Sequence, residues 1–156
     1  MALTQVLVET GVAHGAAAVG ACAASAFEPD RGAMAAQMSS GRSGRLHFTY
    51  TDPSVATDVV SSFPWARSLV VVAVDYLGSS LGPAPTGAVV ARFATSDHYR
   101  LLDSPLDAIS SVLAASGHRV ERLVDDNRLL DRAAAVRAGV GWRGRSTMVL
   151  GPGRGP

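Results

Sequence analysis

The feature that most restricts the fold of this chain is an uninterrupted apolar run at residues 69–74, Leu-Val-Val-Val-Ala-Val. A strand with one face in solvent alternates apolar and polar residues, whereas an unbroken run is typical of a strand that is covered on both faces. Such strands lie in the middle of sheets that carry helices on both sides. The run therefore predicts the central strand of an α/β domain, over residues 68–74.

Helices and strands are predicted to alternate along the rest of the chain, as expected for a single α/β domain of 156 residues. Apolar spacing and helix-stop glycines predict helices at 3–13, 33–38, 105–116 and 127–138. Short apolar or alternating runs predict further strands at 17–21, 88–93, 118–124 and 146–150. Residues 27–30 and 63–67 are predicted turns, and the Gly/Ser-rich segments 39–45 and 77–87 are predicted loops.

The composition favours a water-soluble protein. Hydrophobic residues make up 47% and charged residues 17%, and no apolar run is long enough to cross a membrane. The first ten residues lack the basic start and apolar stretch of a secretory signal. We therefore expect a cytoplasmic protein without a membrane partner.

Several kinds of chemistry are excluded by missing residue types. The only cysteine is Cys22, so the chain by itself cannot hold a disulfide, a cysteine-ligated zinc ion or an iron–sulfur cluster. All 14 basic residues are arginines, which excludes a phosphate-loop lysine and a Schiff-base lysine. The four histidines show no metal-ligand spacing, so no metal site is expected.

The positive charge is concentrated at the C-terminal end. Residues 1–118 contain six arginines and nine acidic residues, whereas residues 119–156 contain eight arginines and four acidic residues. A polyanionic partner would fit this end, and a solvated arginine-rich helix face explains the same charge equally well.

The densest group of polar residues lies between residues 124 and 148. It includes the spacing G-x-G-x-x-G at Gly139, Gly141 and Gly144, which resembles a dinucleotide-binding fingerprint. That fingerprint must follow a strand and open a helix, so that the helix N-terminus faces the pyrophosphate. Here it follows a predicted helix and leads into a predicted strand, which argues against nucleotide binding.

Two acidic positions outside this pattern are candidates for chemistry. Asp125 lies at the end of a predicted strand, where α/β sheets place catalytic groups, although Asp125 or Asp126 could instead cap the next helix. The sequence Asp97-His98-Tyr99 places an acid, a titratable base and a phenol side by side. Its simpler interpretation is a helix cap by Asp97 with two half-buried neighbours.

Three segments together resemble the epoxyqueuosine reductases. They are Pro-Trp-Ala-Arg-Ser at 64–68 with Tyr76, Ala-Arg-Phe-Ala at 91–94 leading into 97–99, and Val-Asp at 124–125 continuing to Asp-Arg-Ala at 131–133 and the glycine-rich segment 138–147. The resemblance covers most of residues 1–156 and is strongest over 63–150. It implies a nitroreductase-like mixed sheet flanked by helices, which forms the N-terminal, cobalamin-binding domain of such enzymes.

The resemblance also implies a reaction and a set of residues. Members of the family reduce epoxyqueuosine in tRNA to queuosine, with cobalamin as cofactor and two [4Fe-4S] clusters in a following ferredoxin-like domain. Asp125 would be the proton donor, since a carboxylic acid with a pKa raised by burial can protonate the departing oxygen. Arg132 would lie near the substrate. The cofactor would be contacted by Ala91, Arg92, Asp97, His98, Tyr99, Trp142, Arg145 and Ser146.

The chain departs from the family pattern at several points. The usual order Tyr-His is exchanged at His98-Tyr99, an expected arginine is replaced by Ala56, and Pro105 enters a helix that is normally continuous. Arg145-Ser146 replaces a Lys-Asn pair, so the positive charge stays while the amide is lost.

Two iron–sulfur clusters need about eight thiolates, so the chain is expected to be truncated and to depend on a separate ferredoxin-like iron–sulfur polypeptide. One alternative is a non-catalytic remnant or interaction module of the same fold. Another is a flavin-binding nitroreductase-like protein, which rests on the fold alone.

Overall fold

The computed structural model describes residues 2–44, 52–76, 91 and 94–151. Contacts divide the chain into two compact units: residues 1–19 with 72–122, and residues 20–71 with 123–156. The predicted strand at 88–93 lies outside the described residues except for Ala91, which is not in a strand. None of the helices in the described part is long and apolar enough to cross a membrane.

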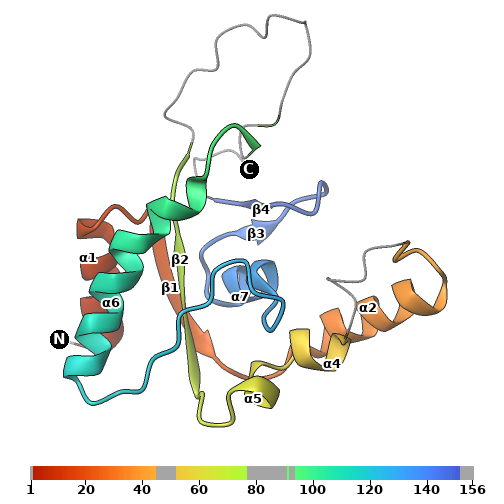
Figure 1. The fold of residues 1–156 in the computed structure, drawn as a ribbon, viewed down its shortest axis with the longest axis horizontal. Helices are drawn as coiled ribbons and strands as arrows, with labels where there is room; N and C mark the ends of the chain where they lie inside the picture. The colour runs from red at the N-terminus through yellow and green to blue at the C-terminus, as the bar shows by residue number, and fades with distance from the viewer. Residues whose placement is uncertain (1, 45–51, 77–90, 92–93, 152–156) are drawn as a thin grey trace, which may run out of the picture. The chain divides into compact units, whose positions relative to one another are not determined.

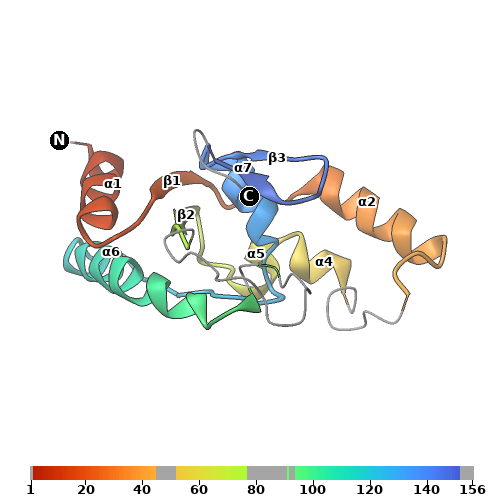
Figure 2. The same cartoon turned by 90° about the horizontal axis from the view of Figure 1, so that it is seen from above.

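The first unit is built around two helices that pack against each other, α1 (Leu3–Ala13) and α6 (Asp103–Ala115). They lie side by side in both views (Figures 1 and 2). A Cβ atom on Gly11 would come within 3.0 Å of the Ile109 Cδ1 atom, so glycine permits this close approach. Leu7 and Ile109 are buried on the facing surfaces. A 3-10 helix, η2 (His98–Leu102), leads directly into α6.

In its described residues, the second unit contains four helices and a hairpin. The helices are α2 (Glu28–Ser39), α4 (Pro53–Ala56), α5 (Val59–Ser62) and α7 (Asp131–Arg137). In the hairpin, β3 (Trp142–Arg143) pairs antiparallel with β4 (Val149–Leu150). The core combines apolar side chains of α5 and α7 with others from the segments between the elements and from residue 69: Ala24, Phe27, Val59, Phe63, Leu69, Ala133 and Ala134.

Arg137, in the last turn of α7, fixes the chain that precedes α2. Its guanidinium lies 3.6 Å from the centre of the Phe27 ring and donates hydrogen bonds to the backbone oxygens of Ser25 and Ala26. Phe27 is only 2% exposed, so this cation–π contact is shielded from water. Arg137 therefore joins α7 to the start of α2 by hydrogen bonds and a cation–π contact.

β1 (Ala18–Ala23) and β2 (Ser68–Ala73) form a second two-stranded sheet. The Ala17 amide donates to the Ala73 carbonyl at 2.7 Å and the Ala24 amide to the Arg67 carbonyl at 3.0 Å, an order that makes the pair antiparallel. Only Leu69 of β2 is buried, and the residues after it are half-buried. In the described part of the chain, β2 pairs with β1 alone, so the predicted central strand with two covered faces is not observed.

The mixed character of the chain, helices with short strands, is confirmed. Four predicted helices are present, and α2 is longer than predicted because it starts at Glu28 and takes in the expected turn. Residues 118–124 were predicted as a strand, and this is wrong. In this segment Arg122 forms ion pairs with Asp103 (3.1 Å) and Asp107 of α6, so the extended chain is held by side chains rather than by a strand ladder.

Candidate functional site

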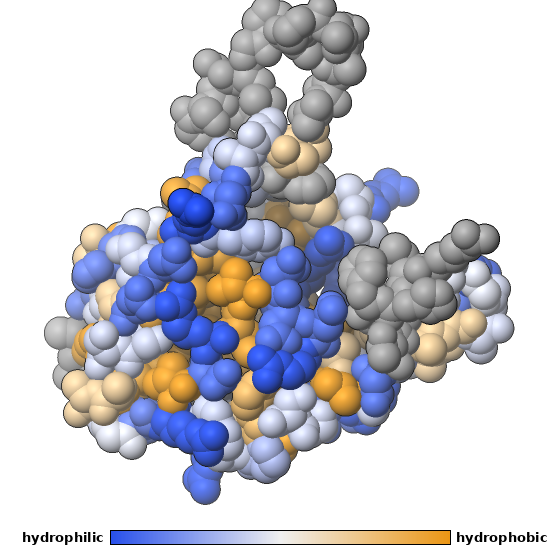
Figure 3. Space-filling model, viewed as in Figure 1, coloured by the Kyte–Doolittle hydropathy of each residue, from blue (hydrophilic) through white to orange (hydrophobic). Residues whose placement is uncertain are grey.

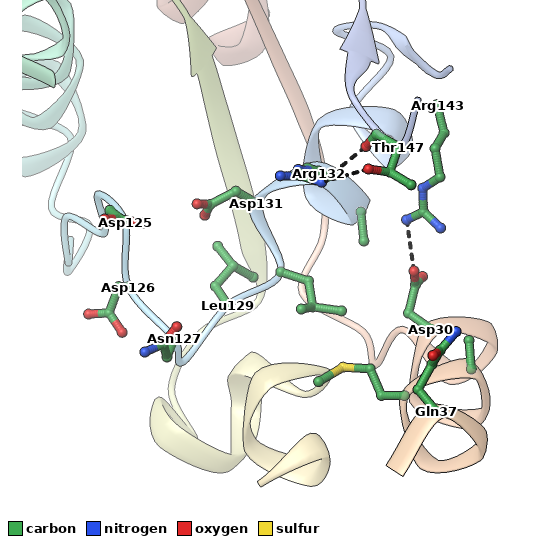
Figure 4. Close-up of a pocket in the computed structure, with 14 residues that line it drawn as sticks. Asp30, Gln37, Asp125, Asp126, Asn127, Leu129, Asp131, Arg132, Arg143 and Thr147 are labelled. Carbon is green, nitrogen blue, oxygen red and sulfur yellow. Dashed lines mark hydrogen bonds and ion pairs between the residues drawn. The ribbon is translucent and has the colours of Figure 1, made fainter. Parts of the chain in front are cut away.

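The second unit contains a pocket of about 410 Å³ between α2, the segment 125–133 and the hairpin. Figure 4 shows that the side chains of Asp125, Asp126 and Asp131 lie on one side of it, while Arg143 and Asp30 lie on the other. Both residues that the sequence assigned to proton delivery and substrate binding, Asp125 and Arg132, line this pocket. The structure thus brings together two candidates that are seven positions apart in the sequence.

Asp125 has an unusual backbone conformation. Its φ angle is +51°, in the left-handed region that residues other than glycine rarely adopt, at a cost of about 1–2 kcal/mol. It follows an extended segment rather than a strand, and it is exposed. Strained residues cluster at functional sites, which makes this conformation notable at a pocket. The burial that was expected to prepare Asp125 as an acid is not observed.

The carboxylate of Asp126 forms an ion pair with a neighbouring arginine, Arg128. The carboxylate accepts from the Arg128 backbone amide at 2.9 Å and from the Arg128 side chain at 2.5 Å. The hydrogen bond from the Arg128 side chain is the main cause that holds the pKa of Asp126 below its usual range. Asp126 therefore caps the turn at 126–129 and not helix α7, whose N-cap is Leu130 and has no side-chain cap. This carboxylate stays ionised.

Asp131, the first residue of α7, behaves differently. The pKa of Asp131 is raised to about 6, chiefly by withdrawal from water and then by the negative charges of Asp125 and Asp126, while the positive charge of Arg132 opposes them. The residue as a whole still reaches solvent. Its carboxyl group lies at the pocket together with Asp125 and Asp126. Asp131 is thus the pocket acid that keeps its proton closest to neutral pH.

Arg132 is held in place by the hairpin turn. Its guanidinium donates to the Thr147 carbonyl oxygen at 3.2 Å and to the Thr147 hydroxyl at 3.3 Å (Figure 4). Thr147 also has a left-handed backbone, with φ at +68°. A β-branched residue pays more for this conformation than most. The two positive-φ residues other than glycine in the described part of the chain therefore both lie at this pocket.

An ion pair spans the other side of the pocket. Arg143 on β3 is 2.7 Å from Asp30 on α2, and the two side chains are 49% and 21% exposed. Both residues line the pocket, so its walls carry four carboxylates and two guanidinium groups. Four of the lining residues were not among the predicted site residues: Asp30, Asp131, Arg143 and Thr147. The sequence predicts one continuous helix over residues 127–138. In the structure residues 127–130 form a turn, and Asp131 is the first residue of α7 and lines the pocket.

The hairpin presents three of the predicted cofactor residues. Trp142, Arg145 and Ser146 are all exposed, and Trp142 keeps half of its surface in solvent. Gly141 is required by the hairpin itself, because a Cβ atom there would lie 2.4 Å from the Leu150 carbonyl oxygen. Gly139 ends α7 with φ at +72°. The glycine-rich segment therefore follows a helix and enters a strand, as predicted, and has no dinucleotide-binding geometry.

The other predicted cofactor residues belong to the first unit. His98 lies 5.0 Å from the Tyr76 ring and contacts the Ser96 hydroxyl. Asp97 pairs with Arg100 at 3.2 Å and gives no side-chain cap, so the simple capping interpretation is wrong. Tyr99 is 55% exposed and Ala91 is exposed, while Arg92 lies outside the described residues. Because η2 is a 3-10 helix, adjacent side chains differ by about 120°, so His98 and Tyr99 face different directions.

Exposed aromatic side chains occur on more than one element: Tyr99 lies on η2 and Trp142 lies on β3. The face in Figure 3 is mostly hydrophilic, with several apolar patches between the polar side chains. In the described part of the chain, no group of three or more histidine, cysteine or acidic residues has the arrangement of a metal site.

The chain is similar to known proteins over most of its length. It is 29% identical over 116 residues to an epoxyqueuosine reductase of Gloeobacter violaceus and 32% identical over 114 residues to one of Staphylococcus aureus. These matches cover 72% and 67% of this chain. They cover 36% and 30% of the relatives, so the chain spans about a third of their length.

A solved structure supports the same relationship. An epoxyqueuosine reductase in complex with an epoxyqueuosine-modified tRNA-Tyr stem-loop matches with a TM-score of 0.78 at 26% identity, over 98% of this chain and 42% of that one. No protein-family model matches the chain.

Proposed function

Because the chain belongs to the epoxyqueuosine reductase family, we propose that it is the cobalamin-binding part of an enzyme that reduces epoxyqueuosine in tRNA to queuosine. The observation that carries the proposal is the pocket that unites Asp125 and Arg132, the residues assigned to proton delivery and substrate binding. The reaction would take place in the cytoplasm. A tRNA stem-loop is bound by a structural relative of this chain.

The residues present suit a large cofactor that is rimmed by amide groups. Such a group needs hydrogen-bond donors and acceptors that are open to solvent before it binds, together with aromatic surface. Arg145 and Ser146 supply donors and Trp142 an exposed indole on the hairpin, and Asp97, His98 and Tyr99 are further contacts that the resemblance to the family implies. In this proposal Ala91 and Arg92 complete the set. Bound cobalamin would supply electrons to an epoxide carbon.

The chain's own residues would handle the proton and the substrate. Opening an epoxide leaves an alkoxide oxygen, which requires a proton at the same time. Asp125 lies at the rim of the pocket and its carboxyl would deliver that proton. The hydrogen bonds from Arg132 to Thr147 fix the position of the guanidinium at the pocket, so that it can orient a polar group of the substrate.

The electrons would come from iron–sulfur clusters carried by a different polypeptide segment. Cys22 is the only thiol in these 156 residues, and it is half-buried with a pKa raised by burial. Two four-iron clusters take about eight thiolates. The arginines of residues 119–156 provide positive charge for a tRNA backbone.

Turnover with a substitute electron source tests the proposal. The purified chain would be mixed with cobalamin, a low-potential chemical reductant and an epoxyqueuosine-modified tRNA stem-loop, and the nucleosides would be quantified by mass spectrometry. We expect queuosine to form, and Asp125→Asn to lower its rate by about 100-fold or more. Glu9→Gln, an exposed acid of α1, is the matched control and should keep the full rate. Cobalamin binding without any queuosine would favour a non-catalytic module instead.

A further inference from the structure

We propose that Asp30 is a positioning residue for the hairpin: through its ion pair with Arg143 it sets the direction in which the Trp142 indole points. The Arg143 guanidinium lies 2.7 Å from the Asp30 carboxylate, although the two residues are 113 positions apart. Figure 4 shows the Arg143 side chain directed at Asp30 on α2. The inference rests on the proposed function for its consequence, since Trp142 is one of the residues proposed to contact cobalamin.

The hairpin is attached to α7 on one side. Both of its strands pack against α7, and residues 138–141 connect that helix directly to β3. Within this connection Val140 is buried, and its amide donates to the Ala135 carbonyl oxygen at 3.0 Å. Arg132 of α7 donates to Thr147 in the hairpin turn. These contacts hold the start and the turn of the hairpin to one helix.

On the side of α2 the hairpin depends on the Asp30–Arg143 pair. Among the residues that the structure describes, no other hydrogen bond or ion pair joins the hairpin to α2. The Asp30 side chain is only 21% exposed, so its carboxylate is shielded better than in an ordinary surface pair. Further along α2, Met34 and Gln37 line the pocket, so the pair crosses the pocket between the two elements. Without it, the hairpin would be held through α7 alone.

Strand geometry links this ion pair to Trp142. Trp142 and Arg143 are consecutive residues of β3, paired with Leu150 and Val149, so their side chains project to opposite faces of the hairpin. Arg143 lines the pocket, whereas Trp142 is not among the described residues that line it. A rotation of the hairpin about its attachment to α7 would move both side chains together. By holding Arg143 at α2, Asp30 therefore keeps the half-exposed indole turned away from the pocket.

A second acid in the same helix turn separates this role from a general effect of charge. Glu28 also lies in the first turn of α2, where either carboxylate interacts favourably with the helix N-terminus. The partner of Glu28 is Arg31 of the same helix, at 3.2 Å. Glu28→Gln therefore removes the same charge from the same turn and leaves the contact with the hairpin intact.

Two measurements on the purified chain test the inference without any cofactor. In a Trp65→Phe background Trp142 is the only tryptophan, so its time-resolved fluorescence anisotropy reports the motion of this indole. Hydrogen exchange of the Gly144 amide, which donates to the Met148 carbonyl oxygen at 2.8 Å, reports opening of the hairpin.

We expect Asp30→Asn to add a fast component to the anisotropy decay and to speed the exchange of the Gly144 amide by about 5-fold. Asp30→Glu, which keeps the charge, should restore most of both signals, and Glu28→Gln should change neither. Signals that stay as in the wild type in Asp30→Asn, or that change equally in Glu28→Gln, overturn the inference.

Titration into cobalamin, followed by the corrin absorption spectrum, tests the consequence for the cofactor. We expect Asp30→Asn and Arg143→Gln each to weaken the affinity by about 5-fold. The double variant should lose no more than either single variant, because the two side chains act as one pair. Unchanged affinity in Asp30→Asn, or losses that add in the double variant, overturn the inference and leave the proposed function standing. A wild-type chain that does not bind cobalamin overturns the proposed function, whereas anisotropy and hydrogen exchange still decide whether Asp30 positions the hairpin.

Discussion

The guanidinium of Arg132 donates two hydrogen bonds to Thr147, a residue whose backbone φ angle is +68°. The arginine lies in the first turn of α7 and the threonine in the hairpin turn, so the contact joins two of the elements that line the pocket. An unfavourable backbone conformation is thereby maintained next to the proposed substrate residue. The backbone strain at Thr147 and the position of the Arg132 guanidinium are therefore linked, because the same hydrogen bonds join the two residues.

Thr147→Gly should stabilise the fold by about 1 kcal/mol, because glycine adopts a left-handed conformation without the penalty of a β-branched side chain. The Arg132 hydrogen bond to the backbone carbonyl would remain. Urea denaturation gives the change in free energy of unfolding. Ser146→Gly, next to it and with an ordinary φ angle, is the matched control and should destabilise by about 0.5–1 kcal/mol. Destabilisation of equal size at both positions would contradict the explanation.

Arg137→Ala should destabilise the fold by about 2–4 kcal/mol, since it removes hydrogen bonds from a charged donor and a shielded cation–π contact with Phe27. The comparison is Arg100→Ala, whose side chain is 84% exposed and forms only a surface ion pair, so a change within about 1 kcal/mol is expected. Thermal unfolding monitored by circular dichroism measures both. Similar losses for the two arginines would show that Arg137 does not join α7 to α2.

Gly141→Ala should destabilise the fold by about 1–3 kcal/mol, because the new methyl group would collide with the Leu150 carbonyl oxygen and the Val149 side chain. Because the hairpin carries Trp142, Arg145 and Ser146, cofactor affinity should fall as well. Gly32→Ala in α2 is the opposite case, with no atom near the added carbon and no positive φ angle. It should stabilise by about 0.5–1 kcal/mol. Chemical denaturation of both variants distinguishes a steric collision at Gly141 from a destabilisation that alanine would cause at any glycine of this fold.

The sequence predicted most of the elements and two residues of the pocket. α1 and α6 have clear apolar stripes and glycine stops, and local rules are sufficient for them. The strand at 118–124 failed because its alternating pattern reflects Arg122 reaching two acids of α6, a contact between residues far apart in sequence. The Asp30–Arg143 pair joins positions 113 residues apart and is equally invisible to local patterns. Asp131 could have been recognised from its place beside Arg132 in the family-like segment, but its pKa depends on charges that only the fold brings near it.

Asp131→Asn should raise stability at pH 7. The pKa of Asp131 is about 6 in the folded chain and about 3.9 for an unfolded aspartate. The folded state therefore binds more protons between these values, so the contribution of this group to stability falls as pH rises from about 4 to 6 and is constant above. Asp131→Asn has no carboxyl group at this position and lacks this loss. Its free energy of unfolding should therefore rise relative to that of the wild type between about pH 4 and pH 6, with no difference expected below pH 4. Urea midpoints measured from pH 3 to pH 8 give the curve.

Asp126→Asn provides the contrast, because the Arg128 hydrogen bond lowers the pKa of Asp126 in the folded chain. The ionised Asp126 carboxylate stabilises the fold above the pKa that Asp126 has in the unfolded chain, and this stabilisation is lost as the pH falls through the lower pKa of the folded chain. The variant should lose about 1 kcal/mol at pH 7, and the loss should shrink in acid. Equal signs for the two variants at pH 7 would contradict the opposite directions of the pKa shifts of Asp131 and Asp126.

The most direct test of the account is a titration of the purified chain into cobalamin, followed by the corrin absorption spectrum. The account predicts a saturable spectral shift that is weakened in Trp142→Ala and unaffected in Glu9→Gln, because the first residue is on the exposed hairpin and the second is on α1. A spectrum that stays unchanged at high protein concentration would contradict the claim that this chain holds the cofactor.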